Sequence, residues 1–296
     1  MKVYLVGLGK MGYNLALNMK AHGHQVVGFD VSADVLKKAN ADGFETIDSL
    51  DQLQKDTERK VIWVMLPAGK ITDSTLLKLE KLVSENDIVI DGGNSDYHVS
   101  VERAKEFANA KAFFMDIGTS GGTYGALHGA SFMVGGDESA YKYIEPLLKS
   151  MAAEDGLLYT GKSGSGHYLK VIHNAILHSM MEVIGEGFDL LHASPFDYDL
   201  KDVAYTWNKS ALIRGWLMEL MYHALDQNKK LDDVSTVIHS SSACADAVKS
   251  GMDLNIPVPA FGLSLLMRQR TQNQETFDAR VINSLRKEVG GYRPEA

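Results

Sequence analysis

Three polar side chains recur at helical spacing in the middle of the chain. Lys170, His173 and Asn174 stand at positions i, i+3 and i+4 after the glycine-rich stretch Gly164-Ser165-Gly166. Residues with this spacing share one face of a helix. The other residues of the stretch are mostly apolar, and burying three polar groups without partners would be costly. The three side chains are therefore expected to line a polar cleft, whereas a single Lys or His would indicate only an exposed surface residue.

Near the N-terminus, three glycines form the pattern G-x-G-x-x-G. Gly7, Gly9 and Gly12 follow the apolar run Val3–Val6 and open an amphipathic stretch from about Lys10 to His22. In a dinucleotide-binding loop, the first glycine permits a tight turn, the second lets the backbone approach a pyrophosphate, and the third lets helix and strand pack closely. The helix N-terminus would offer N–H groups and a positive dipole to the phosphates. A structural turn that binds no cofactor is the alternative.

An acidic residue follows this loop at the end of the next β-rich run, which is typical of a ribose-binding position. Asp30 could accept hydrogen bonds from both adenosine ribose hydroxyls and would repel a 2′-phosphate. The following segment, Val31–Ala33, has no arginine that could hold such a phosphate. NAD is therefore predicted in preference to NADP. Its predicted binding residues are Gly7, Leu8, Gly9, Lys10, Met11, Gly12 and Asp30.

Two further loops follow the ends of β-rich runs. Residues 91–95 read Asp-Gly-Gly-Asn-Ser, and residues 116–122 end in Ser-Gly-Gly. Ligands bind beyond the carboxyl ends of the strands in open α/β sheets, so both loops could contribute to a site. Adjacent backbone N–H groups in the second loop could hold an anion. An ordinary glycine-rich turn is the alternative for that loop.

The elements that must position these residues change character along the chain. β-rich runs are expected at Val3–Val6, Gln25–Asp30, Val61–Leu66, Asp87–Asp91, Ala112–Ile117, Ser131–Val134 and Leu157–Thr160. Helix-like segments separate most of them, and from about Gly166 only the helical i, i+3, i+4 pattern remains. The prediction is an α/β fold with a Rossmann-type, doubly wound, mostly parallel sheet in residues 1–163, followed by an all-helical domain in residues 164–296.

Composition and charge exclude several classes of protein. The 296 residues, 45% hydrophobic and 23% charged, are typical of a two-domain globular chain. A net charge of −8 and the lack of a long basic run argue against nucleic acid as a partner. Cys244 is the only cysteine and no H-E-x-x-H motif occurs, so no internal disulfide and no metal site are expected. Cys244 is expected to be a small buried residue.

The N-terminal residues do not have the pattern of a targeting segment. The apolar run there is interrupted by glycines and by Lys10, too early for a signal peptide or a membrane span. A cytoplasmic protein without a membrane partner is therefore predicted.

Taken in order, these motifs resemble those of the 3-hydroxyacid dehydrogenase superfamily and, more closely, those of its short-chain 6-phosphogluconate dehydrogenase branch. The resemblance spans nearly the whole chain. It is carried by residues 7–12, 91–95, 119–126, 131–136, 164–174 and 212–216.

The resemblance implies an NAD-dependent oxidative decarboxylation of 6-phosphogluconate to ribulose 5-phosphate, CO2 and NADH. It implies that Lys170 is the catalytic base and that Asn174 is a catalytic residue that hydrogen-bonds the substrate. A lysine with its ordinary pKa of ~10.4 must lose its proton first, so burial or a nearby positive charge would have to lower that pKa. Contacts with this anionic sugar acid are implied for Asn94, Ser120, Gly121, Gly122, His173 and Arg214, with Arg268 and Arg270 as further candidates for its anionic end.

The chain departs from the branch at two neighbouring positions and at its end. Leu177 stands where the branch usually has the glutamate that protonates the enediol, and His178 stands where it has a tyrosine that contacts phosphate. The usual C-terminal Gly-Gly-His reads Gly-Gly-Tyr at residues 290–292. His178 could replace the acid only with a rotation of the helix or a bridging water, whereas holding the phosphate needs no adjustment and is the role we expect.

Two other functions are compatible with the motifs. The chain could oxidise a different 3-hydroxy acid, or it could bind a cofactor without turnover. A pure binding protein has no need of a lysine base in its cleft, so Lys170 together with Asn174 argues against the second. The long helix and the apolar second half predict a homo-oligomer, most simply a dimer whose helical domains pack together.

Overall fold

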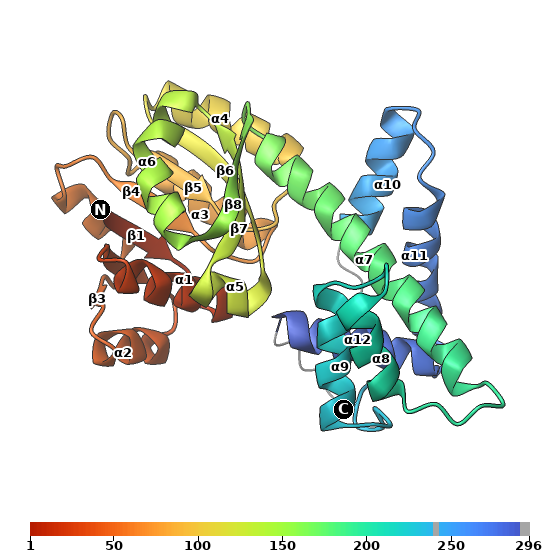
Figure 1. Ribbon diagram of the computed structural model, residues 1–296. Coiled ribbons are helices and arrows are strands. Elements are labelled where there is room, and N and C mark those ends of the chain that lie inside the picture. Colours follow the sequence, from red (N-terminus) through yellow and green to blue (C-terminus); the bar gives the residue numbers. More distant parts are fainter. Residues whose placement is uncertain (239–242, 291–296) are drawn as a thin grey trace. The chain divides into compact units, whose positions relative to one another are not determined.

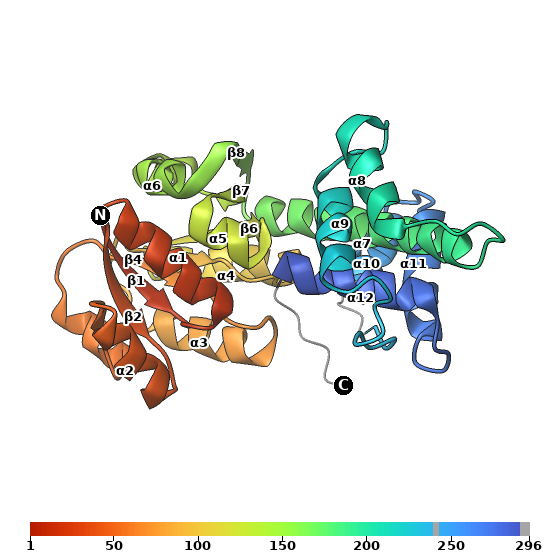
Figure 2. The ribbon, with the colours of Figure 1, turned by 60° about the horizontal axis from the view of Figure 1, so that its bottom comes forward.

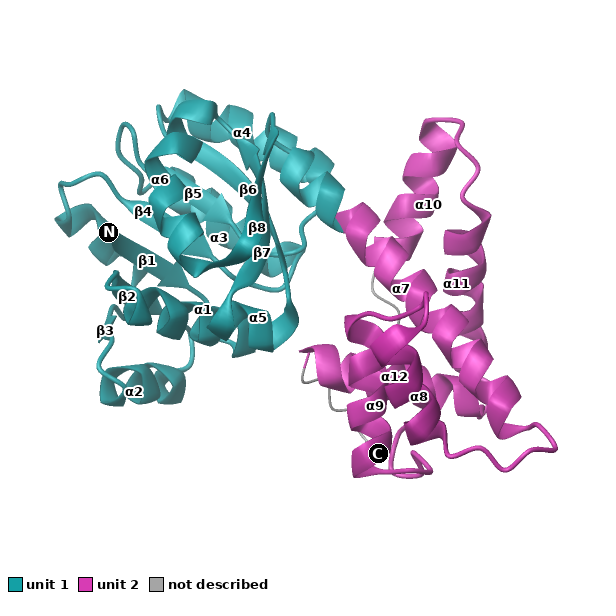
Figure 3. Cartoon of the chain, viewed as in Figure 1, with its two compact units in different colours: residues 1–170 teal, residues 171–296 magenta. Residues whose placement is uncertain are grey.

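The computed structural model describes residues 1–238 and 243–290. The chain divides into two compact units, residues 1–170 and 171–296 (Figure 3). The first unit contains a sheet with helices, and the regular elements of the second, within its described residues, are all helices (Figure 1). The predicted fold class is thus confirmed, while the domain boundary predicted at 163/164 stays a prediction. Residues 291 and 292 of the C-terminal Gly-Gly-Tyr lie outside the described residues.

The first unit, whose residues are all described, is built on one sheet of eight strands. In spatial order these are β3 (Glu45–Thr46), β2 (Gln25–Phe29), β1 (Lys2–Val6), β4 (Val61–Val64), β5 (Ile88–Asp91), β6 (Phe113–Ser120), β7 (Ala130–Gly136) and β8 (Ala152–Gly161). Neighbouring strands are parallel except β6 and β7. The first six follow the order 3-2-1-4-5-6 of dinucleotide-binding sheets, in which the ligand lies where the order reverses beside β1.

Both faces of this sheet are covered, because successive side chains of a strand point to opposite sides. Leu5 belongs to a core beneath α1 (Lys10–Ala21), α2 (Ala33–Ala41), α5 (Gly122–His128) and α6 (Glu138–Met151). Its neighbours Tyr4 and Val6 belong to the opposite core, beneath the 3₁₀ helix η1 (Leu50–Lys55), α3 (Lys70–Glu80) and α4 (Tyr97–Asn109). The two layers can be followed in Figure 2.

The second unit begins within α7 (Ser165–His192). It continues with α8 (Leu200–Ser210), α9 (Trp216–Gln227), α10 (Ala243–Asp253), α11 (Pro259–Arg270) and α12 (Phe277–Gly290). Its main core joins apolar residues of α7, α8, α9 and α12, among them Phe188 and Met221. A smaller cluster joins Ala175 of α7 to Cys244 of α10, which is 1% exposed, so the prediction of a buried cysteine is confirmed. Within the described residues, no helix has both the length and the apolar character needed to cross a membrane.

Candidate active site

The glycine loop between β1 and α1 has the geometry that a pyrophosphate would need. Gly7 has φ +98°, and a Cβ there would lie 2.5 Å from the Met65 carbonyl oxygen. A Cβ at Gly12 would lie 2.0 Å from the Gly7 oxygen. Around Gly9, in contrast, nothing lies within 4 Å of a Cβ position, and Gly9 gives α1 no side-chain cap. Packing therefore requires the outer two glycines, while the middle one leaves open space in front of the N-terminus of α1.

Asp30 lies beside this loop. Its Oδ2 accepts a hydrogen bond from the Leu8 N–H at 2.8 Å, and its Oδ1 accepts one from the Ser32 N–H at 2.9 Å. A carboxylate has about four lone-pair sites, so each oxygen of Asp30 retains acceptor capacity for a ribose hydroxyl. The next side chain, Val31, is 95% exposed and carries no charge. The structure thus brings together the glycine loop and the acidic residue that the sequence predicted as the cofactor site.

Two carboxylates lie side by side on neighbouring strands, one at the end of β5 and one in the middle of β6. Asp91 of β5 pairs in register with Asp116 of β6, and both are buried. Asp91 Oδ1 accepts from the Gly93 N–H at 3.0 Å, and its Oδ2 accepts from the Ser95 hydroxyl at 2.6 Å. These bonds fix the turn that holds Asn94 exposed to solvent.

Asp116 holds the start of α7. Its carboxylate accepts from the Gly164 N–H at 2.7 Å and from the His167 N–H at 2.9 Å. A carboxylate at a helix N-terminus satisfies backbone donors and interacts well with the helix dipole. Burial raises the pKa of the Asp116 carboxyl, and the backbone donors oppose that shift. Asp116 thereby connects the middle of β6 to the helix that carries Lys170.

His167 connects three elements of the first unit. Its Nδ1 lies 2.8 Å from the Ser100 Oγ of α4, and its Nε2 lies 3.1 Å from the Asp91 carbonyl oxygen. A carbonyl only accepts, so Nε2 donates to the Asp91 carbonyl. The ring is 1% exposed. Asp91, Asp116 and His167 were not predicted as site residues, although acids near the ends of two predicted strands and a histidine one turn before Lys170 were visible signals.

Three glycines let the first turn of α7 lie directly on the sheet. A Cβ at Gly118 of β6 would lie 2.5 Å from the Lys170 Cβ. A Cβ at Gly166 would lie 2.3 Å from the Asp116 carbonyl oxygen, and one at Gly135 of β7 would lie 2.7 Å from the Gly166 nitrogen. Any side chain at these positions would push the helix away. This role of the three glycines was not predicted from the sequence.

Lys170 is a buried titratable group at the place where α7 packs against β6. Its side chain is 7% exposed, and burial lowers its pKa from 10.5 to about 8. With that pKa, about a tenth of the molecules carry the neutral amine at pH 7, compared with well under a thousandth for an ordinary lysine. The environment of Lys170 therefore fits the predicted general base.

The Ser-Gly-Gly loop follows Gly118 along the same strand. Ser120 ends β6, and both Gly121 and Gly122, the first residue of α5, take positive φ values, +113° and +61°. All three residues are partly exposed. The turn thus requires glycines and keeps backbone N–H groups close to the strand that packs against Lys170.

The remaining candidates on α7 lie in the second unit. His173 Nδ1 lies 3.1 Å from Asn174 Oδ1, and both side chains are partly buried. His178 Nδ1 lies 3.4 Å from the Cys244 thiol sulfur. Leu177 is also partly buried and packs against the main helical core. Since α7 is continuous, Lys170, Asn174 and His178 form a row at four-residue spacing.

The three candidate arginines differ in their surroundings. Arg214 lies between α8 and α9 and is exposed. Arg268 Nε donates to Glu182 Oε1 at 2.9 Å, and both side chains are buried. Arg270 Nη2 donates to Asp278 Oδ2 at 2.8 Å. Two of the three charges that the resemblance assigns to the substrate's anionic end are therefore each paired with a carboxylate of the protein.

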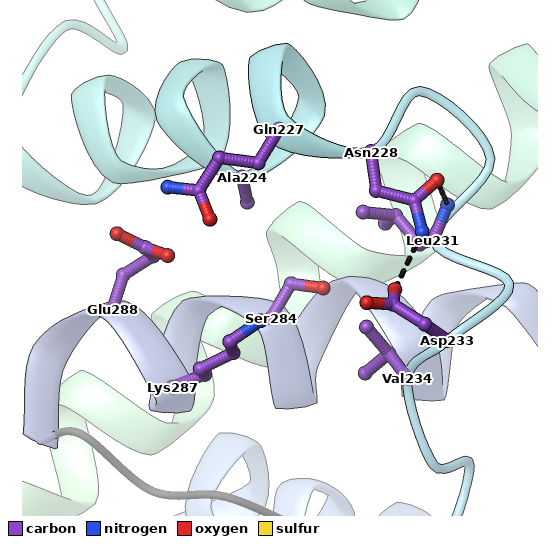
Figure 4. Close-up of a pocket in the computed structure, with 9 residues that line it drawn as sticks. All are labelled: Ala224, Gln227, Asn228, Leu231, Asp233, Val234, Ser284, Lys287 and Glu288. Carbon is purple, nitrogen blue, oxygen red and sulfur yellow. Dashed lines mark hydrogen bonds between the residues drawn. The ribbon is translucent and has the colours of Figure 1, made fainter.

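A small pocket lies between α9 and α12 and does not coincide with these residues (Figure 4). Its volume is about 60 Å³, and its lining includes Gln227, Ser284 and Lys287. Small-molecule sites usually have volumes of about 300–1,000 Å³. The pocket is therefore too small to be the site of a sugar acid.

Family models match both units. The model of the NAD binding domain of 6-phosphogluconate dehydrogenase matches residues 2–163, and the model of that enzyme's C-terminal domain matches residues 166–289. With the glycine loop and the buried lysine, these matches define a nicotinamide-dependent oxidoreductase of the hydroxyacid dehydrogenase class. More particularly, the chain belongs to the 6-phosphogluconate dehydrogenase family.

Relatives cover the whole chain. YqeC of Bacillus subtilis, a provisional 6-phosphogluconate dehydrogenase by name, is 42% identical over 100% of this chain and 99% of its own. The NAD(+)-dependent, decarboxylating 6-phosphogluconate dehydrogenase of Haloferax volcanii is 39% identical over 99% of this chain and 98% of its own. A solved structure of Plasmodium falciparum 6-phosphogluconate dehydrogenase, studied with NADP+ and with 6-phosphogluconate, is 25% identical with a TM-score of 0.82. That alignment covers 92% of this chain and 62% of the Plasmodium chain.

Proposed function

We propose that this chain catalyses the NAD-dependent oxidative decarboxylation of 6-phosphogluconate to ribulose 5-phosphate, CO2 and NADH. The observation that carries the proposal is Lys170, a buried lysine with its pKa lowered to about 8, one helical turn before Asn174. The names of the Bacillus and Haloferax relatives support the substrate, and the Haloferax name also supports NAD and the loss of CO2.

The neutral amine of Lys170 accepts the proton of the C3 hydroxyl as C3 is oxidised. NAD, which the Gly7–Gly12 loop and Asp30 would hold, would supply the hydride acceptor for this oxidation. The product of this step is a 3-keto acid. As the bond to CO2 breaks, its electron pair forms the double bond of an enediol, and the ammonium of Lys170 gives its proton to the former keto oxygen. The carbon that has lost CO2 then takes a proton from solvent, while the enediol hydroxyl at C3 returns its proton to Lys170, which yields the ketose product. Asn174 hydrogen-bonds the substrate, and the Ser120–Gly122 turn holds its carboxylate and hydroxyl.

NAD is the cofactor that the surroundings of Asp30 favour. We expect the wild type to prefer NAD by the ratio of kcat/KM values, because the Asp30 carboxylate would repel a 2′-phosphate. Asp30→Ser combined with Val31→Arg should move this ratio toward NADP by roughly 10- to 100-fold, the size of a charge-assisted hydrogen bond gained and a repulsion lost. Initial rates with each cofactor give the ratio. Val31→Ser alone is the control and should leave it unchanged, whereas a wild type that already prefers NADP would refute this role of Asp30.

The substrate is tested by following NADH absorbance and CO2 release with 6-phosphogluconate, gluconate and other 3-hydroxy acids. We expect 6-phosphogluconate to yield NADH and CO2 in equal amounts. A second candidate function, oxidation of a different 3-hydroxy acid, is favoured by Leu177, which has no proton to give to an enediol. Clear turnover of another acid with none of 6-phosphogluconate would establish that second function instead.

We also infer a homo-oligomer, which remains a prediction. Four large apolar side chains on α7 are exposed at nearly helical spacing: Ile176, Met180, Val183 and Leu190. Contiguous apolar surface of this kind is typical of a protein interface. A second copy of the chain is the simplest partner that would cover it.

A further inference from the structure

The helical unit contains a buried ion pair that the proposed chemistry does not use. Glu182 of α7 and Arg268 of α11 are joined at 2.9 Å, with side chains 6% and 2% exposed. Charges this deeply buried are strongly destabilising unless they are paired. Each residue therefore neutralises the other.

The pairing leaves part of the guanidinium unused. Arg268 Nη2 is buried and has no hydrogen-bond partner among the described residues. Buried polar groups in folded proteins are nearly always hydrogen-bonded, and a guanidinium offers a planar set of donors that suits carboxylate and phosphate oxygens. Arg268 thus retains the geometry of an oxyanion-binding residue, while Glu182 cancels its charge.

Glu182 also belongs to the row of polar residues on α7. It follows Lys170, Asn174 and His178 at the same four-residue spacing. His178 contacts the thiol of Cys244. Leu265, about one turn before Arg268 on α11, packs against the cluster that contains Cys244. The helix that carries Arg268 therefore packs beside the contact partner of His178, the side chain that we expect to hold the substrate phosphate.

We propose that Glu182 is a specificity-determining residue. Because its carboxylate pairs with Arg268, it weakens the binding of a phosphate group at the end of the substrate opposite the carboxylate. The proposal rests on the proposed function. The Glu182–Arg268 pair has no net charge, so a phosphate gains little from Arg268. The chain should therefore distinguish 6-phosphogluconate from unphosphorylated gluconate only weakly. Without the carboxylate's charge, Arg268 becomes a buried cation that a phosphate can neutralise.

The test uses Glu182→Gln, which keeps the side-chain shape and an oxygen that can accept from Arg268 Nε. KM for 6-phosphogluconate should fall about tenfold, while KM for gluconate stays within about twofold of the wild-type value. Inorganic phosphate should raise the Tm of this variant by several degrees and that of the wild type much less. Glu186→Gln is the matched control, because Glu186 lies one turn further along α7 and is exposed. It should change none of these values.

A second variant separates the possible outcomes. Glu182→Gln combined with Arg268→Met removes both charges, and we expect KM for 6-phosphogluconate to stay near the wild-type value. A tenfold or larger rise would mean that Arg268 holds the phosphate in the wild type, which overturns the proposal. So would a Glu182→Gln variant that phosphate stabilises no more than it stabilises the wild type. The Tm measurements need no turnover, so they remain decisive even if 6-phosphogluconate proves not to be the substrate.

Discussion

Lys170→Met should lower kcat by about 100-fold or more, the usual effect of removing a group that transfers a proton in the rate-limiting chemistry. Methionine has a similar length and is tolerated in buried surroundings, so the protein should remain folded. The affinity for NAD should stay nearly unchanged, because the glycine loop and Asp30 lie on other elements of the first unit. Steady-state kinetics and a fluorescence titration with NADH measure the two effects separately.

The kcat/KM of the wild type should also change with pH in a direction that the role of base fixes. A general base must be neutral, and the pKa of Lys170 is about 8, so kcat/KM should rise with pH up to about 8 and level off above it. Lys170→Arg should be inactive across the whole range, because a guanidinium does not lose its proton. Lys162→Met, at an exposed lysine, is the control and should behave as the wild type. Near-normal turnover by Lys170→Met would rule out the role of base.

Gly118→Ala should reduce both turnover and stability. The added Cβ would lie 2.5 Å from the Lys170 Cβ, so the first turn of α7 must move away from β6. Overpacking of this kind costs about 1–3 kcal/mol of unfolding free energy, and a shift of about 1 Å in a catalytic group can lower kcat roughly 100-fold. Urea unfolding and steady-state kinetics measure the two losses.

Gly187→Ala is the matched control for this substitution. Gly187 lies in the same helix α7, and nothing stands within 4 Å of its Cβ position. Alanine in a helix is favoured over glycine by up to about 1 kcal/mol, so this variant should be as stable as the wild type or more stable. Normal turnover by Gly118→Ala would show that the contact with β6 does not position Lys170.

Much of the sheet could be predicted because its strands are buried on both faces and appear as short apolar runs. All four residues of Val61–Val64 are buried, as expected for a central parallel strand. The strand Glu45–Thr46 was missed, because two polar residues at the sheet's edge carry no periodic signal. Strand β6 extends three residues beyond the predicted end, to Ser120, because its backbone continues to pair with the antiparallel β7.

The parts of the site that could be predicted are those whose residues lie close together in the sequence. The glycine loop and the α7 row depend on local spacing. His167 depends instead on Ser100 and on the Asp91 carbonyl, which lie 67 and 76 positions away in the chain. The side chain of His167 binds a backbone carbonyl and a hydroxyl group. No sequence motif indicates such contacts. Likewise, the partners of Arg268 and Arg270 depend on how separate helices pack. The sequence could therefore indicate these arginines as candidates, but it could not show that each is paired with a carboxylate.

The division between the units falls inside a continuous helix, directly after Lys170. Four residues of helix rise about 6 Å, so the helix backbone sets the spacing between the Cα atoms of Lys170 and Asn174. Arg214, in contrast, lies outside that helix, between α8 and α9. The proposed base and this candidate substrate-binding arginine therefore belong to separate stretches of sequence. We expect substitutions around Arg214 to alter the range of acids accepted without changing the pKa of Lys170.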